Sequence, residues 1–185
     1  MMKIEIRRPK TIDIEELDLF FKTVVWDTFN KEGLGNLSED IANEIIVKNE
    51  YLKSDIDSDG EKRYFLLATA ANRIIGTIEY GLTSDLINNC TNGEYRGLVE
   101  IGTLFVSPNY QGQGVGNLLL NSMYITLKSR GIKEFCLDSG YKNAQKVWEK
   151  KFGKPNYLLK DYWGSGADHM IWRKKLEDVS IAFKI

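Results

Sequence analysis

The sequence predicts a single domain with a mixed α/β fold, in which a sheet of several strands is flanked by helices. Its 185 residues fall within the usual size range of one domain. Apolar residues recur at helical spacing in some segments and alternate in others, which gives the order β-α-α-β-β-β-α-β-α-β-β. Hydrophobic residues make up 43% of the chain and charged residues 28%, a composition typical of folded globular proteins.

The N-terminal part is expected to contain one strand followed by two helices. Residues 3–7 alternate between apolar and polar side chains and predict a strand. Residues 13–29 carry apolar side chains at helical spacing, and Glu15 near their start suits the positive end of the helix dipole. Ser38 is the expected N-cap of the second helix, because its hydroxyl can accept a hydrogen bond from the first turn.

The acidic segment that follows begins like a calcium-binding loop. Asp55, Asp57, Asp59 and Gly60 fall at positions 1, 3, 5 and 6 of such a loop. The closing position, where calcium requires a bidentate glutamate, is Leu66. We therefore expect a polar loop between a helix and a strand.

A β-hairpin and a long loop are expected next. Residues 63–70 and 73–81 are rich in strand-forming side chains, and Ala71-Asn72 between them fits a tight turn because asparagine tolerates positive φ. Residues 83–97 are polar and predict a long loop, which in ordered proteins is often functional.

The C-terminal part is expected to alternate strands and helices. The predicted elements are a strand at 98–106, a helix at 114–130, a strand at 134–138, a helix at 143–152, and strands at 157–162 and 169–176. Gly131 and Gly153 are expected to end the two helices, because glycine readily adopts the left-handed conformation found just after a helix.

Charge and cysteine content exclude several classes of function. The net charge of −1 provides no overall basic field for nucleic acid or an anionic membrane. Cys90 and Cys136 lie far apart and match no metal-ligand spacing or disulfide framework, so no metal site is expected. The N-terminus lacks the apolar core of a signal peptide, and no apolar stretch approaches the roughly 20 residues that span a bilayer. We therefore expect a soluble cytoplasmic protein.

A glycine-rich loop between a strand and a helix is the segment that predicts chemistry. Gly112, Gly114 and Gly116 leave backbone N–H groups uncovered at a helix N-terminus, which is a favourable place for a phosphate group. No lysine follows these glycines, which excludes a P-loop. Their spacing also differs from the dinucleotide fingerprint, although Asp138 lies where that fold places its ribose-binding acid.

This loop resembles the signature of the general N-acetyltransferase (GNAT) superfamily. The signature is Gln/Arg-x-x-Gly-x-Gly/Ala, represented here by Gln111, Gly114 and Gly116. It follows an apolar strand that ends Leu-x-Val-x-Pro, at residues 104–108. Residues 143–153 are similar to the later family block Asn-x-x-Ala-x-x-x-Tyr-Glu-Lys-x-Gly-Phe, with some slippage.

The resemblance implies a fold and a co-substrate. It implies that residues 1–185 form one N-acetyltransferase domain with a mostly antiparallel, twisted sheet and a coenzyme A-binding core at about 98–155. In such a domain the co-substrate is acetyl-CoA, whose pantetheine arm would bind the backbone of Leu104, Phe105 and Val106. The pyrophosphate would be wrapped by Gln111, Gly112, Gln113, Gly114, Val115 and Gly116.

The same resemblance makes Asn143 a candidate contact to the coenzyme A arm. An asparagine at the start of a helix is equally expected as its N-cap. Both roles are compatible with the sequence.

Acetyl transfer to an amine requires a base, because an amine with a pKa near ~10 is mostly protonated at neutral pH. Glu100 matches in strand position the glutamate base of the histone-type members of the family, and strand alternation predicts that Gly102, Leu104 and Val106 share its face. Glu79 on the neighbouring predicted strand is the second candidate.

The group that protonates the departing thiolate is left open by the sequence. Many relatives use a tyrosine in the last conserved helix, where this chain has Trp148, which has no comparably acidic proton. Tyr162 or Tyr141 could serve instead, or the thiolate could leave unassisted. His169 is expected to be a structural strand residue, and the aromatic residues near Trp163 belong to a region that often lines the acceptor site in relatives.

Three functions remain open at this stage. The first is an acetyl-CoA-dependent N-acetyltransferase that acts on an amine of a small molecule or a peptide. The oligomeric state is also open, and a homodimer is one of the states that the sequence allows. The second is a non-catalytic acyl-CoA-binding or sensor module on the same fold, suggested by Trp148. The third is a nucleotide-dependent oxidoreductase, suggested only by Asp138.

Overall fold

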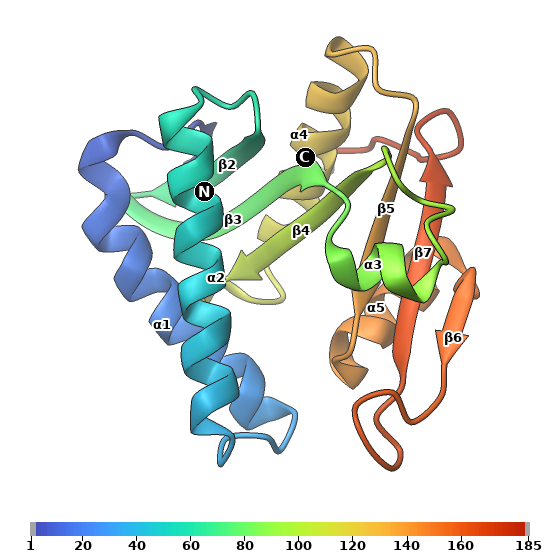
Figure 1. Ribbon diagram of the computed structural model, residues 1–185. Coiled ribbons are helices and arrows are strands. Elements are labelled where there is room, and N and C mark those ends of the chain that lie inside the picture. The colour runs from blue at the N-terminus through green and yellow to red at the C-terminus, as the bar shows by residue number, and fades with distance from the viewer. Residues whose placement is uncertain (1–2, 184–185) are drawn as a thin grey trace. The chain divides into compact units, whose positions relative to one another are not determined.

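The computed structural model describes residues 3–183, and the chain divides into two compact units. Unit 1 comprises residues 1–80, 103–126 and 181–185, and unit 2 comprises residues 81–102 and 127–180. The chain passes from one unit to the other within β3 (Arg73–Leu82), β4 (Val99–Val106) and α4 (Val115–Ser129), which Figure 1 labels.

Unit 1 combines a four-stranded arrangement with helices. Its strands neighbour one another in the order β1-β2-β3-β4. Besides β3, β4 and α4, its elements are β1 (Ile4–Arg7), η1 (Thr11–Asp13), α1 (Ile14–Lys31), α2 (Ser38–Asp57), β2 (Arg63–Ala70) and η2 (Pro108–Tyr110).

The core of unit 1 forms because α1 buries one apolar face against the hairpin. Phe20 and Phe21 on α1 pack with Phe65 and Leu67 of β2 and with Leu52 of α2. Phe21 and Phe65 approach at a ring-centroid distance of 6.5 Å. The apolar spacing in residues 13–29 therefore predicts this helix and its buried face correctly.

The hairpin turn between β2 and β3 contains two residues with positive φ, as its sequence suggests. Ala71 has φ 46° and Asn72 has φ 60°, the pattern that a type I′ turn requires. We expect Ala71→Gly to raise the free energy of unfolding by about 0.5–1 kcal/mol, because only glycine adopts this conformation without a steric cost.

Urea unfolding measures this effect. Ala144→Gly within α5 (Lys142–Phe152) is the control, and it should lower the free energy of unfolding by about 1 kcal/mol, because glycine weakens a helix interior. A decrease of similar size in both variants would show that the turn is not strained at Ala71.

Two predictions about α2 are wrong. The N-cap is Leu37 rather than Ser38, which is the first residue of the helix and makes no capping hydrogen bond. The segment expected to be a polar loop is helical as far as Asp57, and Asp55 is fully buried. The Asp55 carboxylate accepts hydrogen bonds from Arg8 Nη2 at 3.0 Å and from the Phe65 N–H at 2.9 Å. These contacts give the acidic segment a structural role in joining α2 to β2 and to Arg8, the residue after β1.

Unit 2 contains the remaining elements. They are the start of β4, the last turn of α4, α3 (Asp85–Cys90), β5 (Glu134–Ser139), α5, β6 (Tyr157–Leu159) and β7 (His169–Lys175). Its strands neighbour one another in the order β4-β5-β7-β6. β4 pairs with β5 in parallel, whereas β5–β7 and β6–β7 are antiparallel.

The strand pattern confirms the predicted fold class. With β3 and β4 contributing to both units, the seven strands follow the hydrogen-bonding order β1-β2-β3-β4-β5-β7-β6. The β1–β2, β5–β7 and β6–β7 pairs are antiparallel, and β4 and β5 pair in parallel, with Glu100 opposite Cys136. The chain therefore has a mixed α/β fold with a mostly antiparallel sheet and flanking helices.

The expected long loop at residues 83–97 is partly helical, which corrects the prediction. It contains α3, whose N-cap Ser84 accepts a hydrogen bond from the Ile87 N–H. Ile87 and Tyr95 are buried with Cys136 and Ile171 in the core of unit 2. The polar composition concealed this short helix because only a few of its side chains pack inward.

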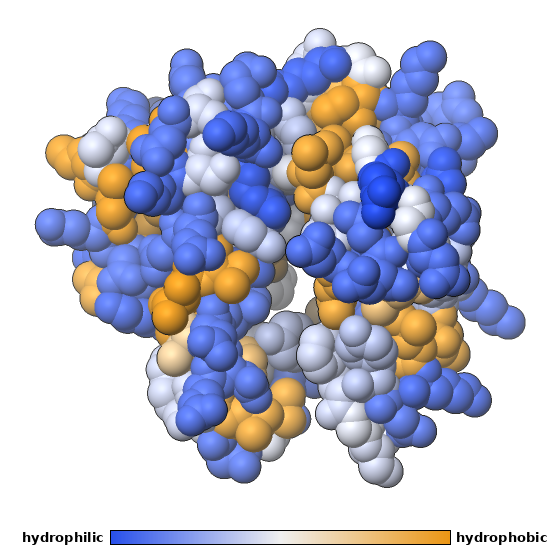
Figure 2. Space-filling view, in the orientation of Figure 1, coloured by the Kyte–Doolittle hydropathy of each residue, from blue (hydrophilic) through white to orange (hydrophobic). Residues whose placement is uncertain are grey.

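Among residues 3–183, no helix combines the length and the apolarity needed to cross a membrane. Figure 2 shows a mainly hydrophilic face on which apolar side chains gather in separate patches.

Candidate functional site

The strand β4 is continuous over Val99–Val106 but contains one residue with positive φ, Thr103, which we call the bulge. Thr103 has φ 48°, an unusual conformation for a branched residue inside a strand. Such a residue disrupts the regular alternation of side chains. The bulge lies between Gly102 and Leu104, so the shared face of Glu100, Gly102, Leu104 and Val106 stays a prediction.

The bulge is held by Thr77 and Glu79 of β3. Thr77 Oγ1 donates to the Thr103 carbonyl at 2.9 Å, and Thr103 Oγ1 donates to Glu79 Oε1 at 3.2 Å. Arg63 Nη1 donates to the other oxygen, Glu79 Oε2, at 2.7 Å. Glu79 is 2% exposed, and burial raises the pKa of its carboxyl group although Arg63 and Lys48 oppose this shift. Both of its oxygens are thus engaged by neighbouring side chains.

The predicted pantetheine-binding segment lies between the bulge and the glycine-rich loop. Leu104, Phe105 and Val106 are each half-buried in β4. The Ser107 N–H that follows donates to the Ile75 carbonyl at 2.9 Å. The segment is thus fixed at both ends while its backbone keeps the extended form that can pair with an amide-containing ligand.

The glycine-rich loop provides an open backbone surface in unit 1. Gly112 and Gly114 have φ 74° and 87°, conformations that other residues rarely adopt. A Cβ atom added at either glycine would meet no atom within 4 Å, whereas one at Gly116 would lie 3.7 Å from Val106 Cγ2. The first two glycines are therefore required by the backbone conformation and leave space above it.

The loop leads into the N-terminus of α4, which begins at Val115. The first backbone hydrogen bond into this helix is donated by the Leu118 N–H to the Gly114 carbonyl at 3.0 Å. Helix geometry leaves the preceding N–H groups without partners inside the helix, and the helix dipole adds a positive partial charge there. Together with the exposed glycines, this arrangement can bind an anion such as a pyrophosphate.

The side chains of Gln111 and Gln113 in the loop form hydrogen bonds with other residues of the protein. Gln111 Nε2 donates to the Val106 carbonyl at 3.0 Å, and Lys31 Nζ donates to Gln111 Oε1 at 2.7 Å. Gln113 Nε2 donates to the Asn109 carbonyl at 2.9 Å. These bonds fix the loop to β4 and α1 and leave its backbone as the part that can meet a ligand.

In unit 2, Glu100 lies at the start of β4 beside α3. The Ser84 N–H donates to Glu100 Oε2 at 2.7 Å. Glu100 is half-buried and stands opposite Cys136 of β5. The hydrogen bond from the backbone N–H fixes the orientation of the carboxylate.

The helix α5 contains two residues whose roles the sequence left open, Asn143 and Trp148. Its N-cap is Tyr141, so the N-cap role considered for Asn143 is wrong; Asn143 is an exposed residue of the first turn. Trp148 is nearly buried and stacks on Phe152 with ring centroids 5.7 Å apart and an interplanar angle of 6°. The tryptophan therefore serves packing at the position where a tyrosine is expected.

Tyr162 lies in the segment between β6 and β7. A hydrogen bond with the Cys90 thiol raises the pKa of Tyr162. Tyr162 also contacts Trp163 and His169 at ring-centroid distances of 4.9 Å and 5.5 Å. Sequence reasoning did not anticipate that these residues form one cluster with Asp138, which lies 3.0 Å from His169.

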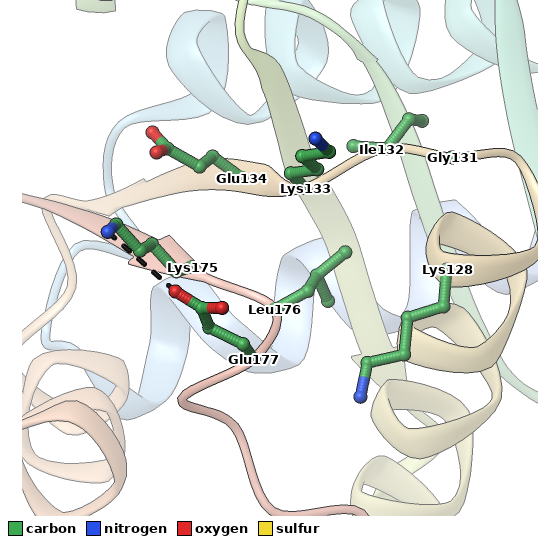
Figure 3. A pocket seen from close by; sticks show the side chains of 8 residues that line it. All are labelled: Lys128, Gly131, Ile132, Lys133, Glu134, Lys175, Leu176 and Glu177. Atoms are coloured by element: carbon green, nitrogen blue, oxygen red, sulfur yellow. Dashed lines mark ion pairs between the residues drawn. The ribbon is translucent and has the colours of Figure 1, made fainter.

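A separate hollow of unit 2 lies away from all predicted site residues. This hollow has a volume of about 550 Å³ and lies where the end of α4, the start of β5 and the end of β7 meet. Figure 3 shows the side chains that line it. Its lining includes Lys128, Glu134 and Lys175, and Lys175 Nζ lies 3.7 Å from Glu177 Oε1. No residue predicted to bind a co-substrate or to take part in catalysis contributes to it.

Comparison with protein families gives one clear match. The model described as the acetyltransferase (GNAT) family matches residues 28–153, which include the bulge, the glycine-rich loop and α5. No curated protein matches the chain.

Solved structures with similar folds are numerous. A protein from Desulfovibrio desulfuricans that is assigned to the GNAT acetyltransferases is 17% identical, with a TM-score of 0.72 over 94% of this chain and 99% of that one. The PaiA N-acetyltransferase from Thermoplasma acidophilum, in complex with coenzyme A, is 22% identical, with a TM-score of 0.67 over 94% and 99%. A protein assigned as an acetyltransferase from Salmonella typhimurium, with its cofactor acetyl-CoA, is 14% identical, with a TM-score of 0.67 over 99% of both chains.

Proposed function

Because this chain belongs to the acetyltransferase (GNAT) family, we propose that it moves an acetyl group from acetyl-CoA to a primary amine by direct attack of the amine on the thioester. The observation that carries the proposal is the open glycine backbone at the N-terminus of α4, which suits a pyrophosphate. Similar structures contain coenzyme A or acetyl-CoA, which supports the same choice of co-substrate.

The proposal assigns co-substrate binding mainly to backbone groups. The N–H groups from Gly112 to Gly116 bind the pyrophosphate, and Gln111 and Gln113 keep the loop in shape. The backbone of Leu104–Val106 binds the pantetheine arm, and an N–H next to the Thr103 bulge polarises the thioester carbonyl. Asn143 contributes a further polar contact to the coenzyme A arm.

Glu100 is proposed as the general base that removes a proton from the attacking amine. Its carboxylate is half-buried and is oriented by the Ser84 N–H. Glu79 is the weaker candidate, because Arg63 and Thr103 already occupy both of its oxygens and burial keeps it from solvent. We assign Glu79 instead to the support of the bulge.

Tyr162 is proposed to protonate the departing thiolate. A tyrosine hydroxyl is protonated at neutral pH and can donate that proton, and the hydrogen bond with Cys90 raises the pKa of Tyr162 further. Trp148 is packed on Phe152 and offers no such proton. The acceptor is an amine of a small molecule or a peptide, and the entire chain of 185 residues acts as one N-acetyltransferase domain.

Thiol release tests the proposed reaction. Purified protein is incubated with acetyl-CoA and a panel of alkyl amines, amino acids and short peptides, and free coenzyme A is followed with a thiol reagent. We expect amine-dependent release together with the N-acetyl product in mass spectra. Failure of acetyl-CoA to bind in a calorimetric titration would exclude the reaction.

A second candidate is a non-catalytic acyl-CoA-binding module, which the replacement of the expected tyrosine by Trp148 favours. It predicts acetyl-CoA binding without turnover of any amine. It also predicts that Glu100→Gln changes nothing beyond small differences in binding. A steep loss of turnover in that variant with unchanged acetyl-CoA affinity rules this candidate out.

A further inference from the structure

Two exposed aromatic side chains of unit 2 are held in fixed positions. Tyr162 and Trp163 are 43% and 57% exposed. Trp163 Nε1 nevertheless donates a hydrogen bond to Nδ1 of His169 at 3.1 Å, and His169 is only 2% exposed. A Cβ atom at Gly140 would lie 2.7 Å from Trp163 Nε1, so glycine allows the indole to approach the end of β5. A buried side chain thus orients a surface ring, which is expected where the ring contacts a ligand.

The other nitrogen of His169 points to a carboxylate that lacks a fixed cation. Because Nδ1 accepts the hydrogen bond from Trp163, the ring proton resides on Nε2. Nε2 lies 3.0 Å from Asp138 Oδ2, yet its N–H is not aligned for a hydrogen bond with any described residue. No other basic side chain among residues 3–183 lies within ion-pair distance of Asp138, whose side chain is 22% exposed. The charge of Asp138 is therefore available to a ligand.

Glu100 lies on the same face of the sheet as Asp138. Glu100 stands opposite Cys136 in the parallel β4–β5 ladder, and Asp138 is two residues farther along β5. Burial, followed by the charges of Glu100 and Asp138, raises the pKa of the Cys136 thiol, which shows that both carboxylates lie near it. Strand spacings place the Cα atoms of the two acids about 8 Å apart.

A basic side chain on the neighbouring strand, Arg173, already has acidic partners. Arg173 is the β7 partner of Cys136. Arg173 Nη2 lies 2.6 Å from Glu134 Oε2, and Nη1 lies 3.8 Å from Glu94 Oε1. Arg173 is thus paired with acids other than Asp138, and His169, which neighbours Asp138, contacts the two aromatic rings of Tyr162 and Trp163.

We propose that Asp138 and the rings of Tyr162 and Trp163 bind a positive charge on the acceptor that is separate from its reacting amine. The inference rests on the proposed function, and it narrows the acceptors to amines with a second cationic group. An ammonium group can donate hydrogen bonds to the carboxylate of Asp138 while it contacts the electron-rich faces of the rings. His169 is a positioning residue that holds Trp163 through a hydrogen bond. It makes no hydrogen bond with the Asp138 carboxylate, which stays open to the ligand.

A matched series of acceptors tests the proposal. 1,5-Diaminopentane, hexylamine and 6-aminohexanoate share one reacting amine and differ at the far end, which is cationic, apolar or anionic. We expect kcat/KM for the diamine to exceed that for hexylamine at least tenfold and that for 6-aminohexanoate at least 100-fold. Calorimetry should show saturable binding of the diamine and much weaker binding of hexylamine.

Variants connect this preference to the proposed residues. Asp138→Asn should reduce the preference for the diamine over hexylamine to less than threefold while the Kd of acetyl-CoA stays within twofold. Trp163→Leu, a change at an exposed position, should weaken diamine binding at least fivefold, and it keeps the test open if Asp138→Asn fails to fold. Asp178→Asn removes an exposed carboxylate of the same unit and should leave the preference unchanged.

The outcomes separate this inference from the proposed function. Equal turnover of the diamine and hexylamine, or no saturable diamine binding, overturns the inference while amine acetylation stands. A preference that survives both Asp138→Asn and Trp163→Leu also overturns it. If acetyl-CoA itself does not bind, the proposed function fails, and diamine binding by calorimetry still decides whether the cation site exists.

Discussion

Replacing Glu100 with glutamine is expected to lower kcat for acetyl transfer about 100-fold or more. A positioned general base typically contributes a factor of ~10² to 10⁴, and glutamine cannot accept the amine proton. Glutamine keeps the size of the side chain and an oxygen that can still accept the Ser84 N–H. The fold and the affinity for acetyl-CoA should therefore remain close to those of the unchanged protein.

Steady-state kinetics and calorimetry on the same preparation measure both quantities. Glu149→Gln, at an exposed position of α5, is the charge-matched control and should retain full activity. A raised pH should partly restore the rate of Glu100→Gln, because more of the amine is then unprotonated without help from a base. Full activity of Glu100→Gln at neutral pH would remove Glu100 from the mechanism.

Replacing Gly114 with valine is expected to weaken acetyl-CoA binding at least tenfold. Gly114 has φ 87°, which a branched residue adopts only with strain, so the loop must shift. A shift misaligns the N–H groups that we propose bind the pyrophosphate. Each hydrogen bond to a charged group contributes about 1.5–3 kcal/mol, and about 1.4 kcal/mol corresponds to a tenfold change in Kd.

Gly131→Val is the matched control for this change. Gly131 has φ 72° and, like Gly114, no atom within 4 Å of an added Cβ, but it follows the opposite end of α4. Both variants should therefore lose a similar amount of stability, about 1–2 kcal/mol, measured by urea unfolding. Only Gly114→Val should raise the Kd of acetyl-CoA. An equal loss of affinity in both variants would assign the effect to general destabilisation.

Much of the fold follows from local patterns in the sequence. The apolar spacing around Phe20 and Phe21 identifies α1 and its buried face, because a helix repeats every 3.6 residues. Ala71-Asn72 identifies the hairpin, because asparagine tolerates the positive φ of a tight turn. Gly131 identifies the end of α4, because glycine readily adopts the left-handed conformation found just after a helix. The glycine-rich loop is recognisable for the same reason.

Other features depend on contacts between distant residues and were not predictable. The bulge at Thr103 depends on Thr77 and Glu79 of another strand, and threonine itself gives no local signal for positive φ. The cluster of His169 and Asp138 depends on the pairing of β5 with β7, which brings together residues far apart in the sequence. A single histidine in the sequence does not indicate which residue it contacts in the fold.

Comparison of acetyl-CoA with acetyl-pantetheine tests the central claim most directly. The two molecules carry the same thioester, but only acetyl-CoA carries the pyrophosphate that we propose binds at Gly112–Gly116 and the N-terminus of α4. Calorimetric titration should show saturable one-to-one binding of acetyl-CoA and at least tenfold weaker binding of acetyl-pantetheine. Equal affinities, or no binding of acetyl-CoA, would contradict the account.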